Sequence, residues 1–226
     1  MAADDASLDA LGQYATRYVK SGQVIGLGTG RAASSFLRAL GASGISVRGV
    51  PTSSGAGELA RSVGIPIVTL AEVGKIDVDL DGADEVDGRL NLIKGYGGAL
   101  VREKIVAASS RRFIVLVGYE KVVKKLGERG IVPVEVVPFG VSLVTAKIKA
   151  LGMKPRVREK NGQQYITDNG NLILDCAVKG IANPARLDRE LLAIPGVVGT
   201  GLFIAMADVV LVAEESGKIR ALKRRQ

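Results

Sequence analysis

The sequence contains no histidine and only one cysteine, Cys176. Without histidine, the side chain that most often acts as a general base near neutral pH is missing, so a carboxylate or a lysine must take that role. A single thiol excludes an intrachain disulfide and a thiolate cluster, and together these absences argue against a zinc or other transition-metal site. Carboxylates alone are able to hold magnesium, so that alternative stays open at this point.

Long apolar runs and a targeting segment are also missing. No run is long enough to span a bilayer, and the first residues, MAADDASLDALGQYA, are acidic where a secretory signal would be basic and then apolar. These features predict a cytoplasmic protein without a membrane partner.

Aromatic residues are scarce, at 4%, although the net charge is +8. None of them interleaves with the two basic clusters, which lie around Lys121 and Lys125 and in the tail at Lys218, Arg220 and residues 223–225. Base stacking is therefore not indicated, and we expect no nucleic-acid partner. The charge suits anionic metabolites or plain solubility, and we expect the tail to be a solvated terminus.

The first half of the chain alternates apolar, strand-like segments with segments of helical spacing. Strands are predicted at 24–27, 47–50, 65–70, 76–80 and 113–117, and helices at 7–19, 31–40, 55–63 and 99–108. This βαβ rhythm is typical of an α/β fold with a mostly parallel sheet and helices on both faces.

The pattern changes after Gly127. Strands are predicted at 132–137, 155–159, 164–167, 172–174 and 197–201, helices at 141–151 and 184–193, and a hairpin turn at Asn161-Gly162. This order, close to βαββαβ, indicates a compact α+β unit over 128–202. A last apolar strand at 209–213 rejoins the first sheet, so the first domain comprises 1–127 and 203–226.

The most informative stretch runs from Asp81 to Lys104 and reads DGADEVDGRLNLIKGYGGALVREK. It places Asp81 and Asp84 where a strand ends, then Lys94 in a glycine-rich loop, then Glu103 in a helical segment. Open α/β sheets bind their ligands at such strand ends. Each residue also has an ordinary interpretation: the aspartates as turn or cap residues, and Glu103 as a solvent-facing helix residue.

Two further loops follow predicted strands. GLGTG at 26–30 opens a helix, and such a turn binds an anion with its backbone N–H groups. A dinucleotide fingerprint is excluded because Arg31 stands where its last glycine is required. Arg31 is instead a possible charge partner of a phosphate, and Lys121, after the strand at 113–117, is either a surface lysine or another phosphate contact. PTSSG at 51–55 also follows a strand, and its more ordinary interpretation is a helix cap.

Taken together, these segments resemble the ribose-5-phosphate isomerase A family. The matching segments are GLGTG at 26–30, PTSSGAGELA at 51–60, DGADE at 81–85, KGYGGALVREKI at 94–105, KLG at 125–127, PVEVVP at 133–138, DNGNLILD at 168–175 and IPGVVGTGLF at 194–203. The resemblance implies interconversion of D-ribose 5-phosphate and D-ribulose 5-phosphate without a cofactor. It also implies a Rossmann-like domain with an inserted ferredoxin-like α+β domain, in a homodimer or homotetramer.

The resemblance assigns roles to individual residues. Glu103 resembles the family's proton-transfer base, and burial is expected to raise its pKa to roughly 6–7. Asp81, Asp84 and Lys94 match the polar catalytic residues, with Lys94 meeting the oxyanion and the aspartates moving hydroxyl protons. The expected substrate contacts are Thr29, Gly30, Arg31, Ala32, Gly82, Ala83, Gly95, Tyr96, Gly97 and Lys121.

The chain departs from the family pattern at two places. Arg31 and Ala32 replace the usual hydroxyl residues of the phosphate loop, and Tyr96 interrupts the glycine loop after Lys94. Two other functions remain as alternatives: an amino-sugar phosphate deaminase, against which the lack of histidine counts, and a non-catalytic sugar-phosphate sensor. Binding of ribose 5-phosphate without isomerisation would favour the sensor.

Overall fold

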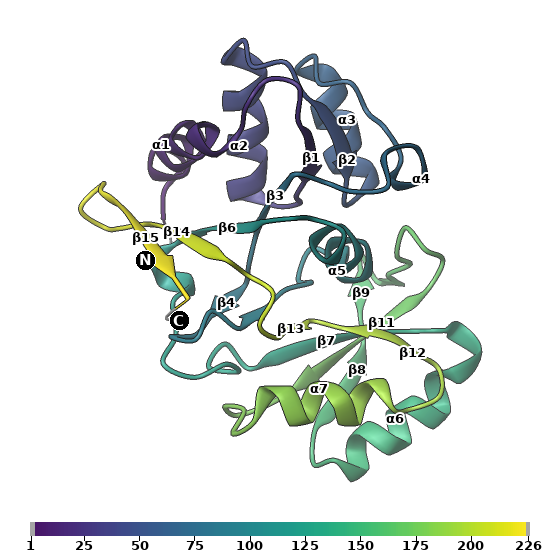
Figure 1. Cartoon of the computed structure of the whole chain (residues 1–226). Helices are drawn as coiled ribbons and strands as arrows, with labels where there is room; N and C mark the ends of the chain where they lie inside the picture. The colour runs from purple at the N-terminus through teal and green to yellow at the C-terminus, as the bar shows by residue number, and fades with distance from the viewer. Residues whose placement is uncertain (1–2, 225–226) are drawn as a thin grey trace.

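A six-stranded sheet in the order β15-β14-β6-β3-β1-β2 forms the frame of the fold (Figure 1). The computed structural model describes residues 3–224. The strands of this sheet are β1 (Val24–Leu27), β2 (Arg48–Pro51), β3 (Val78–Gly82), β6 (Phe113–Gly118), β14 (Val209–Ala213) and β15 (Ile219–Lys223). All neighbouring strands are parallel except β14 and β15. The predicted α/β class with a mostly parallel sheet is therefore confirmed.

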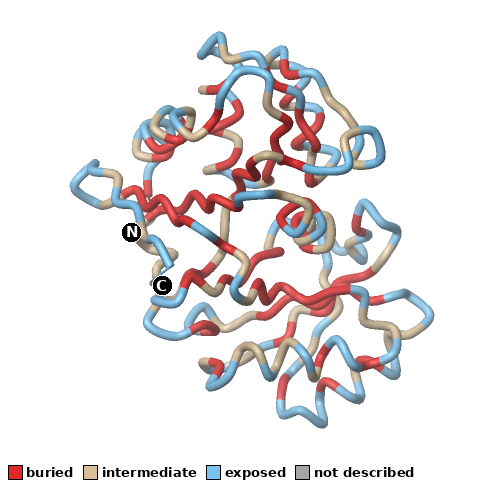
Figure 2. The backbone as a smooth tube through the Cα atoms, viewed as in Figure 1, coloured by how far each residue is buried: buried red, intermediate tan, exposed pale blue. Residues whose placement is uncertain are grey.

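Helices cover both faces of this sheet, as the sequence predicts. The helices α1 (Asp5–Ala15), α2 (Arg31–Ala42) and α3 (Ser54–Ser62) contribute to one apolar core, and α5 (Leu100–Ala108) packs on the opposite face. Three of the inner strands, β1, β6 and β14, are consequently buried along their whole length, and β3 is buried up to its last residue (Figure 2). Parallel strands covered on both sides read as continuous apolar runs, which is why the sequence predicted them.

The helix at the start of the chain begins two residues earlier than predicted. The Asp4 side chain accepts a hydrogen bond from the Ser7 N–H and caps α1, which is followed by the 3-10 turn η1 (Thr16–Tyr18). An aspartate in this position satisfies an N–H group that the helix leaves free.

The predicted strand at 65–70 is wrong. The segment makes one isolated bridge, between Gly49 and Ile67, and the short helix α4 (Leu70–Val73) begins at its end. Pro66 has no N–H group for a ladder, and the side chains of Thr69 and Glu72 form a capping box that starts the helix.

The basic tail was expected to be a solvated terminus, and its described part is mostly exposed but forms a strand that was not predicted. Residues 219–223 form β15, an antiparallel edge strand along β14, and the Arg224 guanidinium donates to the Ala207 carbonyl oxygen. Charged side chains on an edge strand oppose edge-to-edge association. Arg225 lies outside the described residues.

A second, antiparallel sheet lies below the first in Figure 1, in the order β12-β7-β11-β8. Its strands are β7 (Ile131–Val136), β8 (Lys154–Val157), β11 (Leu172–Ala177) and β12 (Val197–Thr200), and α6 (Val141–Ala150) and α7 (Pro184–Leu192) cover one face. The predicted turn at Asn161-Gly162 joins β9 (Glu159–Lys160) to β10 (Gln163–Gln164), and both turn residues have positive φ.

Short elements connect the two sheets. β4 (Glu85–Val86), β5 (Leu92–Ile93) and β13 (Leu202–Phe203) form a small three-stranded sheet, and two 3-10 turns, η2 (Tyr119–Lys121) and η3 (Pro138–Gly140), follow β6 and β7. The segment carrying Lys94 therefore leaves β5 between the two larger sheets.

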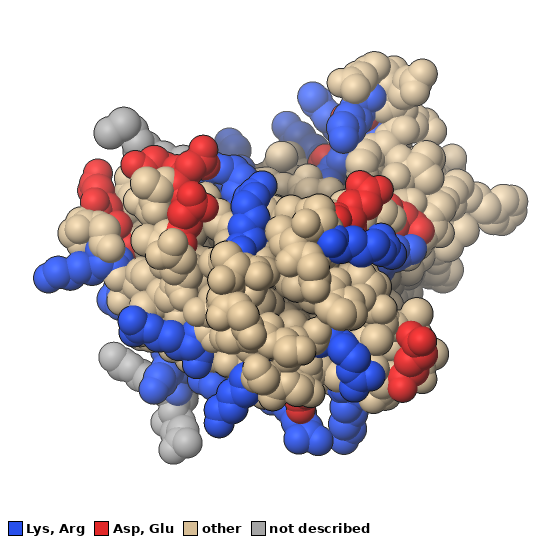
Figure 3. Space-filling view, turned by 90° about the horizontal axis from the view of Figure 1, so that it is seen from above, with Lys and Arg blue, Asp and Glu red and all other residues tan. Residues whose placement is uncertain are grey.

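The surface shows how the excess positive charge is distributed. On the face seen in Figure 3, Lys and Arg side chains are spread over the molecule with acidic groups between them. Among the described residues, no helix is long and apolar enough to cross a membrane.

Candidate active site

A cavity of about 210 Å³ lies at the carboxyl ends of β1, β3 and β6. Parallel strands bring their carboxyl ends to one edge, so loops far apart in the sequence meet there. All but two of the residues expected from the sequence line it: Thr29, Gly30, Arg31, Ala32, Gly82, Ala83, Asp84, Lys94, Gly95, Gly97, Glu103 and Lys121. The two exceptions are Asp81 and Tyr96.

Lys94 is the central charge of the site. Its side chain is only 2% exposed, and Nζ lies 3.0 Å from Asp81 Oδ2 and 3.5 Å from Glu103 Oε1. Nζ also donates to the Gly82 carbonyl oxygen, and the Lys94 backbone N–H donates to the carbonyl oxygen of Gly201, the residue before β13. These neighbouring negative groups raise its pKa against the effect of burial, so the ammonium stays charged.

Glu103 lies in the first turn of α5 and is buried, contrary to the ordinary expectation for a glutamate between Arg102 and Lys104. Burial raises the pKa of Glu103 to about 8, with Asp81 and Asp84 adding to the shift and Lys94 opposing it. The direction agrees with the expectation, and the value is higher than expected. Its Oε2 has no hydrogen-bond partner among residues 3–224.

Asp81 lies at the end of β3, fully buried beneath the cavity. Its Oδ1 accepts hydrogen bonds from the N–H groups of Thr29 and Gly82, at 2.8 and 2.7 Å. Gly28 passes so close that a Cβ there would lie 2.3 Å from Asp81 Oδ1. Asp81 thus holds the loop after β1 in place and, through its other oxygen, orients Lys94.

Asp84 lines the cavity, and its Oδ2 accepts the Tyr96 backbone N–H at 2.9 Å. Burial raises the pKa of Asp84, while that hydrogen bond and the charges of Lys94, Lys121 and Arg129 oppose the rise. The Tyr96 ring packs against the core of the second sheet, so Tyr96 contributes its backbone to the site.

The loop after β1 ends at the N-terminus of α2. Gly30 has a positive φ of 100° and precedes the helix, whose first N–H groups have no partner within the helix. The Arg31 guanidinium, expected as a phosphate partner, is instead paired with Asp5 at 2.8 Å and is 60% exposed. The helix N-terminus, more than this side chain, supplies the positive potential of this end of the cavity.

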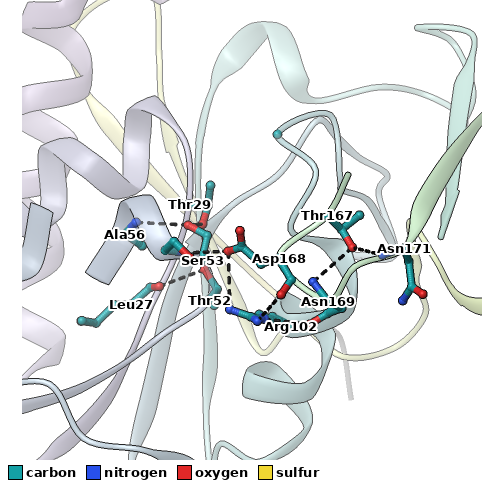
Figure 4. Close-up of polar contacts among 12 residues, drawn as sticks. Leu27, Thr29, Thr52, Ser53, Ala56, Arg102, Thr167, Asp168, Asn169 and Asn171 are labelled. Atoms are coloured by element: carbon teal, nitrogen blue, oxygen red, sulfur yellow. Dashed lines mark hydrogen bonds and ion pairs between the residues drawn. The ribbon is translucent and has the colours of Figure 1, made fainter. Parts of the chain in front are cut away.

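Hydroxyl groups from two loops meet beside it (Figure 4). Thr29 Oγ1 lies 2.9 Å from Thr52 Oγ1 and 2.8 Å from Ser53 Oγ, and Ser53 also caps α3 by accepting the Ala56 N–H. The loop at 51–55 therefore has the expected capping role and also orients Thr29.

Sequence reasoning missed several residues of the cavity. Leu8, Gly118, Glu120 and Arg129 line it. Arg129 follows no strand end and matched no motif, and it is held there because its backbone N–H donates to Glu85 Oε1 at 2.7 Å.

Asp79, two residues before Asp81 on β3, was also missed. It is fully buried, and neither carboxylate oxygen has a hydrogen-bond partner in the described part of the chain. Burial, together with the neighbouring Asp81, raises the pKa of Asp79 well above its ordinary value. The described residues hold no group of three or more His, Cys, Asp or Glu side chains arranged to bind a metal ion.

This combination of fold and site defines an acid–base enzyme for a small anionic substrate. A buried carboxylate of raised pKa and a buried lysine face a cavity that ends at a helix N-terminus.

Comparisons with known proteins specify the family. The model of the family "Ribose 5-phosphate isomerase A (phosphoriboisomerase A)" matches residues 48–217. Ribose-5-phosphate isomerase A of Roseiflexus sp. (strain RS-1) is 49% identical over 211 residues, covering 91% of each chain. The protein of the same name from Gloeobacter violaceus is 46% identical over 218 residues, covering 93% of this chain and 95% of the relative.

Solved structures agree with the sequence comparison. Ribose 5-phosphate isomerase A from Neisseria gonorrhoeae superposes with a TM-score of 0.93 at 37% identity, covering all of both chains. A D-ribose-5-phosphate isomerase in complex with phospho-erythronic acid gives 0.93 at 39% identity, covering 97% of this chain and 98% of the other. The chain belongs to the ribose 5-phosphate isomerase A family, and it is an isomerase.

Proposed function

We propose that this isomerase interconverts D-ribose 5-phosphate and D-ribulose 5-phosphate by proton transfer through a cis-enediolate, with Glu103 as the base. The observation that supports this most directly is the pair formed by Glu103 and Lys94, 3.5 Å apart in a cavity whose far end is the N-terminus of α2. An aldose–ketose isomerisation needs one base and one cation at the developing oxyanion, and this pair provides both.

The proton moves between neighbouring carbons. Glu103 removes it from C2 of the open-chain aldose and returns it to C1, so the base ends as it began. Oε2, buried without a hydrogen-bond partner among the described residues, is the oxygen free to take the proton. The Lys94 ammonium stabilises the negative charge that forms on the substrate oxygen.

The aspartates have different roles in this proposal. Asp84 lines the cavity and moves hydroxyl protons, including those of ring opening. Asp81 was expected to share that task, but it is fully buried and bound to Lys94 and two backbone N–H groups. We assign Asp81 the positioning of Lys94 and Thr29.

The phosphate binds at the N-terminus of α2. Its contacts are the N–H groups that follow Gly30 and the Thr29 hydroxyl, with Lys121 adding positive charge at the cavity wall. The backbone of Gly82, Ala83, Gly95 and Gly97 shapes the space for the sugar. This arrangement needs no cofactor.

A coupled assay for ribulose 5-phosphate, run with EDTA present, tests the proposal. We expect turnover by the wild type, inhibition by phospho-erythronic acid competing with the substrate, and a loss of at least about 100-fold in kcat for Glu103→Gln. The matched control is Glu58→Gln, an exposed glutamate on α3. Near-wild-type turnover by Glu103→Gln rules out the assignment of the base, and binding of ribose 5-phosphate without turnover by the wild type indicates a sensor.

The domain organisation is part of the same proposal. Residues 128–202 form a ferredoxin-like unit inserted into a Rossmann-like domain of residues 1–127 and 203–226. In support, the second sheet carries the order β12-β7-β11-β8 with two helices on one face. Limited proteolysis at the two junctions tests these boundaries. Size-exclusion chromatography tests the predicted homodimer or homotetramer, and cell fractionation tests the cytoplasmic location.

A further inference from the structure

One turn of the second sheet reaches the elements that carry the active site (Figure 4). Residues 167–171, here the bridging turn, connect the β9–β10 hairpin to β11. Asp168 Oδ2 accepts the Ser54 backbone N–H at 2.7 Å, at the start of α3. From α5, Arg102 donates to the Asp168 carbonyl oxygen at 2.6 Å and to Asn169 Oδ1 at 2.8 Å. The bridging turn is thus bonded to two helices of the first domain.

The bridging turn is anchored in the second sheet by a buried carboxylate. Glu135 on β7 is fully buried, and its Oε1 accepts hydrogen bonds from Thr167 Oγ1, Asn169 Nδ2 and Asn171 Nδ2 at 2.9–3.0 Å. The Thr167 N–H also donates to the Asn171 carbonyl oxygen at 2.9 Å. Three hydrogen bonds to one buried oxygen leave these side chains little freedom to move, so the bridging turn is a fixed support.

On the other side, the contact leads directly to the proposed phosphate site. Ser54 is the first residue of α3, and Ser53, the cap of that helix, lies 2.8 Å from Thr29 through their hydroxyl oxygens. Thr29 lines the cavity. A carboxylate at a helix N-terminus is stabilised by the free N–H groups there, so Asp168 holds the segment that orients Thr29.

The contact has little value as a stabilising ion pair. The Arg102 and Asp168 side chains are 39% and 34% exposed, and their closest charged atoms are 3.5 Å apart. Exposed pairs of this kind contribute little to stability. The short hydrogen bond from the Ser54 N–H to Asp168 therefore indicates that Asp168 serves to hold the start of α3 in place.

We propose that Asp168 is a positioning residue for phosphate binding: through the Ser54 N–H it fixes the 52–54 segment, which aims the Thr29 hydroxyl at the phosphate. This inference rests on the proposed function. It assigns the second sheet a part in binding the substrate, although the bridging turn contributes no residue to the cavity lining.

Two variants remove the same hydrogen bond from opposite sides. Asp168→Ala deletes the acceptor, and Ser54→Pro deletes the donor at the first helical position, where proline is favoured. Losing a hydrogen bond to a charged group changes a binding constant by about tenfold. We expect each variant to raise KM for ribose 5-phosphate about tenfold with kcat within about twofold, and to raise the inhibition constant of inorganic phosphate equally.

Three further measurements separate positioning from general damage. The double variant should raise KM no more than either single variant, because both act on one bond. Asp168→Asn, which keeps an acceptor oxygen, should stay within about threefold of the wild type. Glu58→Ala, which removes an exposed carboxylate from the same helix, should change neither constant.

The outcomes are separable from those of the proposed function. If the wild type fails to turn over ribose 5-phosphate, the proposed function is wrong. If the wild type is active and both variants keep the wild-type KM and phosphate inhibition, with at most a lower melting temperature, the bridging turn is merely structural and the inference is overturned. Additive effects in the double variant overturn it as well.

Discussion

Replacing Lys94 with methionine keeps most of the side-chain volume and removes the one lysine buried among the site's carboxylates. Lys94 Nζ lies 3.0 Å from Asp81 and 3.5 Å from Glu103, with all three side chains at most 5% exposed. Removing one partner of a buried ion pair destabilises a protein by about 3–5 kcal/mol. For a chain of this size, this lowers the melting temperature by about 6–20 °C.

The loss should depend on pH in a defined direction. Without Lys94, burial and mutual repulsion raise the pKa of Glu103 further above the unfolded value of about 4.3. The folded variant then binds more protons than the unfolded chain, so its stability falls as pH rises above about 4. The difference from the wild type should be largest at pH 8 and small at pH 4.

Calorimetry at pH 4, 6 and 8 and the ribulose 5-phosphate assay measure the two effects. We expect kcat to fall at least about 100-fold, the typical cost of losing an oxyanion donor. Adding Glu103→Gln to Lys94→Met should recover part of the lost stability and none of the activity. A Lys94→Met enzyme that melts within about 2 °C of the wild type at pH 8 would refute the reasoning.

Three other predictions concern the same region. For wild-type enzyme, kcat/KM should rise with pH to a plateau with an apparent pKa of about 8, because Glu103 acts as a carboxylate, and a profile flat from pH 6 to 9 contradicts this. In urea titrations, Asp79→Asn should raise the free energy of unfolding by about 1–3 kcal/mol at pH 8 and hardly change it at pH 3. The reason is that the raised pKa of Asp79 makes folding take up a proton, which costs free energy only above the pKa of the unfolded chain. Gly28→Ala, whose Cβ would lie 2.4 Å from the Asp81 Cα, should lower the free energy of unfolding by about 1–3 kcal/mol and remove most of the activity. The control Gly22→Ala, in open space at a positive φ, should lower the free energy of unfolding and leave the activity unchanged.

The sequence predicted the main sheet well because its strands follow a local rule. Buried parallel strands read as short apolar runs, and their carboxyl ends share one edge, so the loops at Thr29 and Asp84 were expected together. The strand predicted at 65–70 does not form, although the segment is apolar, because Pro66 lacks an N–H group and the Thr69 capping box starts a helix. The C-terminal strand β15 was not predicted because it is rich in charged residues, which are common in edge strands.

Side-chain environments were harder to predict, because they depend on contacts between distant segments. Spacing alone makes Glu103 an exposed helix residue, and its burial follows from the packing of α5 between β3 of the first sheet and β7 and β12 of the second. The pairing of Arg31 with Asp5 joins the first residues of two neighbouring helices, α2 and α1. Asp168 matched a family motif, yet its contact with Ser54 appears only when the second sheet is placed against the first.

The attachment of Lys94 to Gly201 has a consequence for how the enzyme loses activity. The loop that carries this lysine is held by the small connecting sheet, whose strands are only two residues long. Elements with few backbone hydrogen bonds open at lower free energy than the longer inner strands of the main sheet. Rising denaturant should therefore abolish turnover before the helical circular dichroism signal declines, and amide exchange at residues 92–95 and 202–203 should be faster than in β3 and β6.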